Sequence, residues 1–414
     1  MSEKELRRLA VLGRVAGGDL KLVQAAELLE LSYRQGKRIW RRFRDEGAAG
    51  LVHRSAGKAS NRAYPERWRR RVLRLVREKY SGGVGERFGP TLAAEHLAEE
   101  DGLEVHAETL RRWMLAEGLW SRERKRSPYR KRRMRREHFG ELVQLDGSFE
   151  AWLEERGPQG CLMNLVDDAT STTLCRLGEE ETIWAAAGVV RRWIERYGVP
   201  QALYTDWKNV YVREPTAKEL VTGEVPRTQL GRMCARLGIR ILPASSPQAK
   251  GRVERSHGTH QDRLIKKLRR RNICTPAGAN RYLEQEYLPG HNRRFARAPA
   301  GQQDFHRPAP SGAEMQRAFR LESERVVSND WVVSYAGRGL QLQRQSRHYA
   351  PAQARVTVWE DEEGHLEVEY RGQKLAWEEI GREERGRADA AKPGRAERPA
   401  SHPRFQAHNQ RGQF

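Results

Sequence analysis

The sequence predicts a multidomain protein with an α-helical N-terminal region, an α/β core and a small all-β C-terminal barrel. The chain has 414 residues, beyond the length at which one hydrophobic core keeps growing, so several domains are expected. Apolar residues recur with a helical period up to about residue 120 and with a strand period after His138. Lys and Arg number 77 against 55 Asp and Glu, a surplus that favours an anionic partner such as nucleic acid.

The composition argues against a membrane protein and against a disulfide framework. The longest uncharged apolar run, 182–190, is far shorter than the roughly 20 residues that a spanning helix needs. The start, MSEKELRRLA, has no apolar core behind its basic residues, so no secretory signal is expected. The four cysteines stand far apart without a Cys-x-x-Cys pair. We therefore expect a cytoplasmic protein that does not enter a membrane.

A helix-turn-helix is predicted within residues 1–60. Residues 20–46 form two stretches of helical period broken at 30–32, and Ser32 suits the N-cap of the second helix. The apolar residues that should pack between the two helices are Ala25, Leu28, Leu29, Ile39, Trp40 and Phe43. The opposite side of the second helix carries the predicted DNA-binding cations Arg34, Lys37, Arg38, Arg41 and Arg42. Such a helix suits the major groove of DNA, and the alternative is a solvated basic hairpin.

Residues 61–120 form a second helical domain, either another helix-turn-helix or a helical spacer. Helices are expected at 66–80, near 91–100 and from 107. Residues 121–137 follow as a basic linker that should lie extended along a phosphate backbone, or bind polyanions non-specifically. Its predicted DNA contacts are Arg130, Lys131, Arg132 and Arg133.

The core domain spans residues 138–305. Three apolar segments, within 141–153, 161–170 and 171–178, predict strands, and the last two form a hairpin that turns at 167–169. A helix at 182–198, two short strands with a helix between them, and a long helix from Pro247 complete a mixed α/β sheet. Residues 306–380 alternate as in a small antiparallel barrel, and the apolar-poor residues 381–414 predict a disordered tail.

Three carboxylates of the core predict a metal site. Asp146 lies on one surface of the first strand, Asp206 ends a later strand, and Glu254 lies on the long helix. Strand ends are where ligands gather in an open α/β sheet. Carboxylate oxygens suit Mg²⁺, with Mn²⁺ as substitute, and two such ions can drive an in-line phosphoryl displacement.

Neighbouring residues complete the predicted site. Lys250 and His257 share a helical face with Glu254, and we expect both to contact DNA phosphate or else to be solvated. Asp167 and Asp168 are alternative ligands, although a turn role is favoured for this pair.

The order of these carboxylates, with Ser246-Pro247 and Gly251-x-x-Glu254 introducing the last one, resembles the catalytic core of retroviral integrases and DDE transposases. With its N-terminal segments AAELLELS and GAAGLVHRS, the chain from about residue 20 to about 375 resembles ISNCY-type transposases of bacterial insertion sequences. The resemblance implies a ribonuclease-H-like core in which Asp146, Asp206 and Glu254 are the catalytic metal ligands. The sequence departs from the pattern of these cores in two places, with Trp207-Lys208-Asn209 after the second Asp and with a polar insertion in 212–227.

The resulting expectation is a DNA transposase that binds the ends of an insertion sequence and catalyses metal-dependent 3′-end cleavage and strand transfer. Its partners would be double-stranded DNA, at the element ends and the target, and further copies of itself on DNA. It would be associated with the nucleoid, and no organic cofactor is expected. The alternatives are a non-catalytic DNA-binding regulator derived from a transposase and a metal-dependent nuclease without joining activity.

Overall fold

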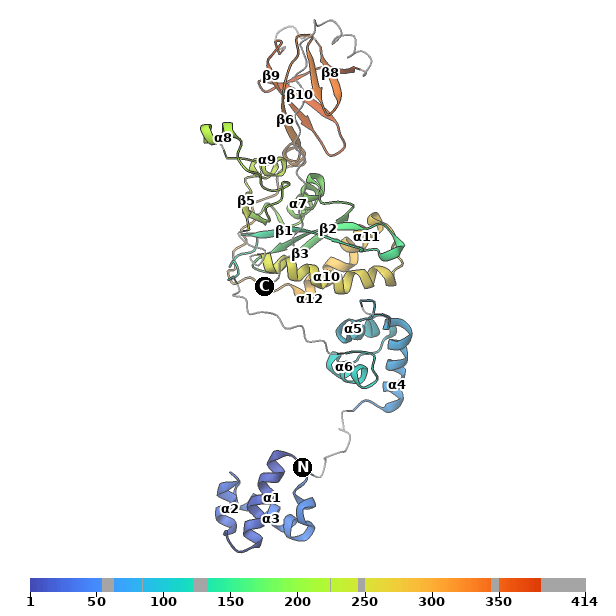
Figure 1. Ribbon diagram of the computed structural model, residues 1–414, viewed down its shortest axis with the longest axis vertical. Helices are drawn as coiled ribbons and strands as arrows, with labels where there is room; N and C mark the ends of the chain where they lie inside the picture. The colour runs from blue at the N-terminus through green and yellow to red at the C-terminus, as the bar shows by residue number, and fades with distance from the viewer. Residues whose placement is uncertain are drawn as a thin grey trace, which may run out of the picture. The chain divides into compact units, whose positions relative to one another are not determined.

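The computed structural model describes residues 1–53, 63–83, 85–121, 133–223, 225–244, 250–343 and 350–380. These residues form two compact units, 1–123 and 124–414 (Figure 1). The finer domain boundaries remain predictions. The predictions for Arg130, Lys131, Arg132 and the tail lie outside the described residues. Within the described ranges, no helix has both the length and the apolar character needed to cross a bilayer.

The predicted helix-turn-helix is confirmed as α2 (Leu22–Leu28) and α3 (Tyr33–Glu46). The Ser32 side chain accepts a hydrogen bond from the Gln35 backbone and caps α3. A Cβ on Gly36 would lie 3.0 Å from the Ala26 Cβ, so glycine permits the close approach of the two helices. The helix α1 (Glu3–Ala16), which the sequence reasoning missed, and the 3₁₀ turn η1 (Gly47–Leu51) complete the core. The expected burial of Leu28 was wrong, because its side chain is exposed.

The second helical group has the expected elements. They are α4 (Glu66–Leu75), which continues as the π-helical turn η2 (Val76–Tyr80), α5 (Pro90–Asp101) and α6 (Ala107–Ala116). Leu92 and Leu97 of α5 pack with Leu110 and Met114 of α6. This group therefore has a hydrophobic core of its own.

The second unit contains a five-stranded mixed sheet. Its strands are β1 (Val143–Glu150), β2 (Gly160–Asp167), β3 (Thr173–Gly178), β4 (Ala202–Thr205) and β5 (Arg240–Pro243). Their order is β3-β2-β1-β4-β5, with β1, β2 and β3 antiparallel and with β4 and β5 parallel to β1. Three antiparallel strands followed by two parallel ones give the ribonuclease-H-like topology that the resemblance implied, so the predicted core fold is confirmed.

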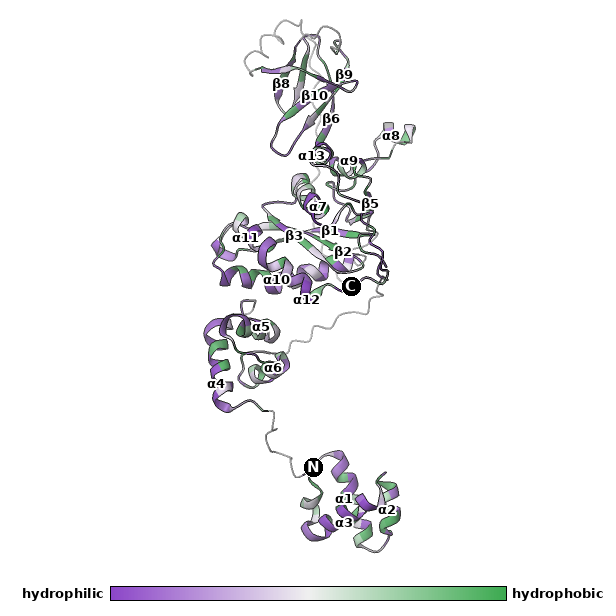
Figure 2. Cartoon of the chain, turned by 180° about the vertical axis from the view of Figure 1, so that it is seen from behind, coloured by the Kyte–Doolittle hydropathy of each residue, from purple (hydrophilic) through white to green (hydrophobic). Residues whose placement is uncertain are grey.

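Helices cover both faces of this sheet (Figure 1). One face packs against α7 (Ile183–Tyr197) and α9 (Gln229–Arg236), and the other against α10 (Gly251–Arg270), α11 (Pro276–Tyr282), the π-helical turn η5 (Leu283–Tyr287) and α12 (Leu288–Phe295). Successive residues of β2 serve the two faces, since Leu162 packs with α10 and Met163 with α7. In Figure 2, α10 is largely hydrophilic in colour, as expected of a helix that covers a sheet and faces solvent.

Two short helices lie outside this layered core. The predicted insertion contains α8 (Ala217–Thr222), and the 3₁₀ turn η3 (Glu154–Arg156) follows β1. Both interrupt segments that the sequence reasoning left without helix.

After the helix α13 (Gly312–Ala318), the described residues of the C-terminal part, 321–343 and 350–380, are all-β. Its strands are β6 (Leu321–Val326), β7 (Val332–Tyr335), β8 (Arg338–Leu342), β9 (Arg355–Glu360), β10 (Leu366–Tyr370), β11 (Gln373–Leu375) and β12 (Trp377–Ile380). They form one sheet in the order β11-β10-β9-β6 and another in the order β12-β8-β7, around a shared hydrophobic core. The all-β character is confirmed, whereas closure into a single barrel is not.

Candidate active site

Parallel pairing of β1 with β4 brings Asp146 and Asp206 to the same end of the sheet. Gln144 of β1 is opposite Tyr204 of β4 in this register. Asp146 and Asp206 each follow two residues later. Asp146 comes from the middle of β1, and Asp206 follows the last residue of β4. The structure therefore brings these two predicted site residues together, one from the middle of β1 and one from the end of β4, and their role as metal ligands stays a prediction.

The ammonium group of Lys250 lies between the two aspartates. Its Nζ donates to Asp146 Oδ1 at 2.8 Å and lies 3.7 Å from Asp206 Oδ2. The Lys250 side chain is only 6% exposed. We expected this lysine on a DNA-contacting surface, but in the structure it is buried against Asp146, and a DNA contact stays a prediction.

A second cation and a buried carboxylate lie beside Asp206, and the sequence reasoning missed both. Lys208 Nζ lies 3.6 Å from Asp206 Oδ2 and 2.5 Å from Glu181 Oε2. Tyr211 donates to the other Glu181 oxygen at 2.6 Å. Burial alone would lower the pKa of Lys208, but hydrogen bonding and attraction to Glu181 raise that pKa above its usual value.

Glycine at position 147 allows Glu181 to approach the strand that carries Asp146. A Cβ there would lie 2.9 Å from the Glu181 carboxylate and 2.8 Å from Cys161 Sγ. The only sequence signal for Glu181 was its place just before the helix α7, which does not distinguish it from its neighbours Glu179 and Glu180.

His257 faces Asp146 from α10. Its Nε2 lies 3.7 Å from Asp146 Oδ2, and neither ring nitrogen has a hydrogen-bond partner among the described residues. Burial lowers the pKa of His257 to about 4, although Asp146 opposes the shift. The imidazole is therefore neutral near pH 7, and a DNA contact for it stays a prediction.

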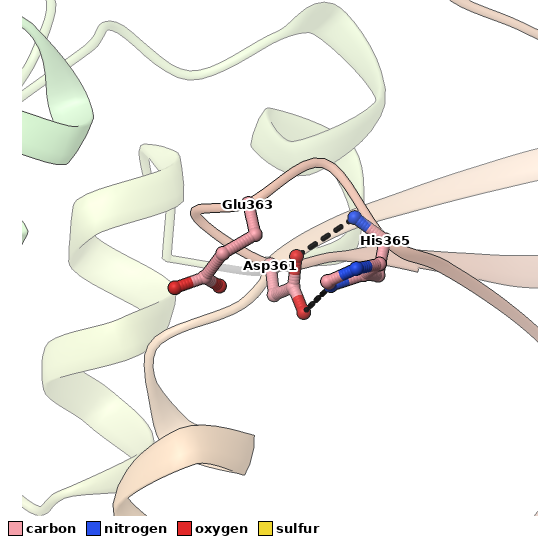
Figure 3. A group of neighbouring side chains, drawn as sticks. All are labelled: Asp361, Glu363 and His365. Carbon is pink, nitrogen blue, oxygen red and sulfur yellow. Dashed lines mark hydrogen bonds and ion pairs between the residues drawn. The ribbon is translucent and has the colours of Figure 1, made fainter.

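Glu254 lies in the first turn of α10 with an exposed side chain. Among the described residues, three metal-ligating atoms come within 4.8 Å of one another only at Asp361, Glu363 and His365. The three predicted carboxylates therefore do not converge to that distance here. Figure 3 shows that Asp361 accepts hydrogen bonds from the backbone and ring of His365 within the β9–β10 turn. This carboxylate shapes a hairpin and belongs to none of the strands that carry Asp146 or Asp206.

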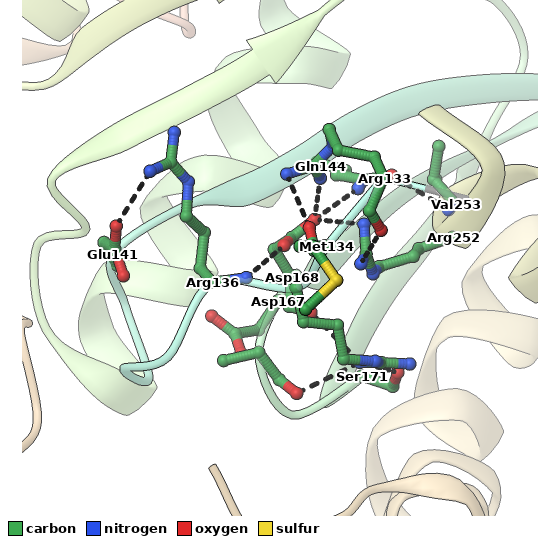
Figure 4. A network of polar contacts seen from close by, with 12 residues as sticks. Arg133, Met134, Arg136, Glu141, Gln144, Asp167, Asp168, Ser171, Arg252 and Val253 are labelled. Atoms are coloured by element: carbon green, nitrogen blue, oxygen red, sulfur yellow. Dashed lines mark hydrogen bonds and ion pairs between the residues drawn. The ribbon is translucent and has the colours of Figure 1, made fainter. Parts of the chain in front are cut away.

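Asp168 is completely buried and surrounded by cations, as Figure 4 shows. Its Oδ1 pairs with Arg133 and accepts from Gln144 at 2.7 Å and from Arg252 at 2.8 Å. Its Oδ2 accepts from the Arg136 backbone at 2.8 Å. The network joins the segment before β1, the strand β1 and the first turn of α10.

The carboxylates of Asp167 and Asp168 are both used inside the fold. Asp167 accepts from the backbones of Thr170 and Gly140 and from the Thr170 hydroxyl, so it closes the turn. Asp167 has the turn role that was favoured for this pair, whereas the Asp168 side chain holds the cationic network instead. Arg133, expected on DNA phosphate, instead pairs with Asp168.

Most of the predicted DNA-binding cations of α3 are on its open side. Arg34, Lys37, Arg38 and Arg41 are exposed. Arg42 is half-buried and donates to the Val52 carbonyl at 3.0 Å. Its placement on the outer face was therefore wrong, because it holds the chain that follows α3.

Comparison with known proteins identifies the family. The chain is 37% identical over 387 residues to the protein named "Putative transposase y4bF" of Sinorhizobium fredii (strain NBRC 101917 / NGR234), covering 93% of this chain and 83% of the relative. This chain belongs to the transposase family. The transposase is also 26% identical over 392 residues to the transposase for insertion sequence IS1202 of Streptococcus pneumoniae, covering 86% of this chain and 80% of that one.

Two domain families match the helical region of the transposase. A helix-turn-helix domain matches residues 7–59, and a homeodomain-like domain matches residues 35–114. Among solved structures, the HTLV-2 integrase catalytic core domain in complex with magnesium matches with a TM-score of 0.28 and 17% identity, over 35% of this chain and 83% of that one. The match to residues 7–59 covers the observed α2 and α3, and both matches support DNA binding by the transposase.

Proposed function

We propose that this transposase binds the ends of its own element and, in the ribonuclease-H-like core, cuts the 3′ ends and joins them to target DNA. The observation that carries the proposal is the pair Asp146 and Asp206, brought together by two parallel strands with a cation between them. A regulator that only occupied DNA would have no need of such a pair.

Of the predicted ligands, Asp146 and Asp206 are suited to a divalent cation. Asp206 Oδ1 is buried with no hydrogen-bond partner among the described residues, although a buried carboxylate oxygen ordinarily has one. Lys250 already shows that the two aspartates hold positive charge. We propose that Asp146, Asp206 and Glu254 hold Mg²⁺, with Mn²⁺ as substitute, because hard ions prefer carboxylate oxygens. When bound, such ions activate the attacking oxygen and stabilise the leaving oxygen of a phosphoryl transfer.

The remaining residues have separate roles in this proposal. The exposed cations of α3 recognise the element ends in the major groove. Glu254 lies in the first turn of α10, and the Asp168 network holds that turn beside β1. Two ends must be cut and joined together, so we propose a homo-oligomer assembled on DNA and an association with the nucleoid.

The test uses a labelled element-end fragment and the full chain. D206N and E254Q keep the side-chain shape but remove the charge that holds a hard cation. We expect DNA binding to survive while cleavage and joining fall by about a hundredfold or more. E195Q, which loses an exposed partner of Arg191 on α7, is the matched control and should react like the wild type.

The outcomes separate this proposal from its alternatives. A wild type that binds the ends but never cuts them would support the regulator, and one that cuts without joining would support the nuclease. Cleavage in EDTA would exclude the metal mechanism. An E254Q protein of wild-type activity would show that Glu254 is not the third ligand.

A further inference from the structure

Lys250 has no role in the reaction proposed above, yet it occupies the centre of the acidic site. It is the N-cap residue of α10, and its side chain is 6% exposed. We propose that Lys250 is a built-in counter-ion, which holds Asp146 and Asp206 together in the metal-free protein and leaves when a divalent ion binds. This inference rests on the proposed function, because it assumes that the two aspartates are metal ligands.

Electrostatics favour a cation at this place. The side chains of Asp146 and Asp206 are only 16% and 28% exposed, so water screens their mutual repulsion poorly. The Lys250 ammonium lies 2.8 Å from one carboxylate and 3.7 Å from the other. A divalent ion bound by both aspartates would lie between the same two carboxylates as the ammonium group and would be repelled by its charge. Lys250 and the ion therefore compete for this place.

Lys208 does not fit this role, although its Nζ lies 3.6 Å from Asp206 Oδ2. Its nearest carboxylate is Glu181, at 2.5 Å, and nearly half of its side chain is exposed. Lys208 can therefore stay beside Glu181 when an ion enters. For Lys250, the contacts described are all with the two aspartates, so an incoming ion takes both of its partners.

The position of Lys250 on the helix permits the movement. As the N-cap it has φ −92° and ψ 15°, outside the regular helix, and its side chain caps no backbone group. Moving this side chain breaks no hydrogen bond of α10. The helix itself stays attached, because the Val253 backbone donates to Gln144 and Arg252 pairs with Asp168.

A counter-ion and an ordinary structural ion pair predict opposite effects on metal affinity. If Lys250 only stiffens the site, its removal loosens the aspartates and weakens metal binding. If Lys250 competes with the ion, its removal strengthens metal binding. The direction of the change is therefore diagnostic.

The experiment is calorimetric titration of Ca²⁺ into the full chain without DNA, so that turnover plays no part. We expect K250M to bind Ca²⁺ about tenfold more tightly than the wild type, as an order of magnitude for removing one competing charge. The matched control is K266M, which removes an equally buried lysine from the same helix, where it pairs with Asp262. K266M should bind Ca²⁺ like the wild type.

Thermal unfolding gives a second measurement on the same variants. In EDTA, K250M should unfold at a lower temperature than K266M, because the two aspartates then lose the ammonium group that lies between them. Saturating Ca²⁺ should raise the midpoint of K250M by more than that of the wild type. If K250M does not fold, K250Q replaces it in both measurements, and K250R, which keeps the charge, should retain the weaker affinity.

Failure of this inference can be distinguished from failure of the proposed function. An affinity of K250M equal to or below that of the wild type would overturn the counter-ion role while leaving the metal site intact. Ca²⁺ binding that is absent in the wild type and in K250M, or unchanged in D146N, would overturn the metal site itself and the counter-ion with it.

Discussion

Replacing Asp168 by Asn should destabilise the second unit strongly, although the site proposed for catalysis does not include this residue. The carboxylate is fully buried and pairs with Arg133 and Arg252, whose side chains are 32% and 11% exposed. An amide keeps the size of the side chain but leaves both guanidinium groups without a counter-charge. Whichever way the amide turns, its NH₂ group would also replace an oxygen that now accepts a hydrogen bond and would face that donor.

The magnitude follows from the burial. Removing one partner of a buried ion pair costs about 3–5 kcal/mol, because the remaining charge is uncompensated. Partial exposure of Arg133 favours the lower end, so we expect the free energy of unfolding to fall by about 3 kcal/mol. For a unit of this size that corresponds to a midpoint roughly 6–12 °C lower.

The assay is urea and thermal unfolding of the full chain, monitored by circular dichroism. The control E195Q breaks an exposed pair on α7 with a 3.1 Å separation, for which a loss of less than about 1 kcal/mol is expected. The R252M substitution should lower the free energy of unfolding less in D168N than in the wild type, because Arg252 has already lost the Asp168 charge there. If D168N and E195Q unfold alike, the central role given to Asp168 is refuted.

Two further predictions concern the arginines of α3 and the buried histidine His291 of α12. R38A should weaken the preference for element ends over random DNA with little change in unfolding, whereas R42A should mainly lower stability, because Arg42 donates to the Val52 carbonyl. Gel-shift competition measures the DNA preference, and thermal unfolding measures the stability. An equal loss of DNA preference in R38A and R42A would contradict this prediction. Burial lowers the pKa of His291 to about 4 from 6.5. As the pH falls below 6.5, His291 therefore takes up a proton in the unfolded chain but not yet in the folded one. The free energy of unfolding should then fall between pH 6.5 and 4, by up to about 3 kcal/mol from this residue. Urea unfolding at several pH values measures the slope, and H291Q should reduce it; an unchanged slope would show that His291 is not responsible.

Much of the fold could be predicted because its signals are local. A strand period in 143–150 and a helical period in 183–197 reflect which side of each element meets the core. The cap at Ser32 depends on a backbone group only three residues away. The segments that were missed, such as α1 and α8, have exposed apolar side chains at Leu6, Leu220 and Val221 that blur the helical pattern.

For the candidate site too, the sequence predicted the local features but not the contacts between distant residues. The sequence alone determined that carboxylates stand in or after two strands and near the start of a long helix, and parallel pairing then brought Asp146 and Asp206 together. It did not determine their partners, because Lys250 reaches Asp146 across 104 positions of the chain and Arg252 reaches Asp168 across 84. Periodicity shows whether a residue faces the core, but not which distant charge it meets there. Only the tertiary structure, by packing α10 against β1 and β2, decided that Lys250 would be buried between two aspartates and that Asp168 would join the segment before β1 to α10.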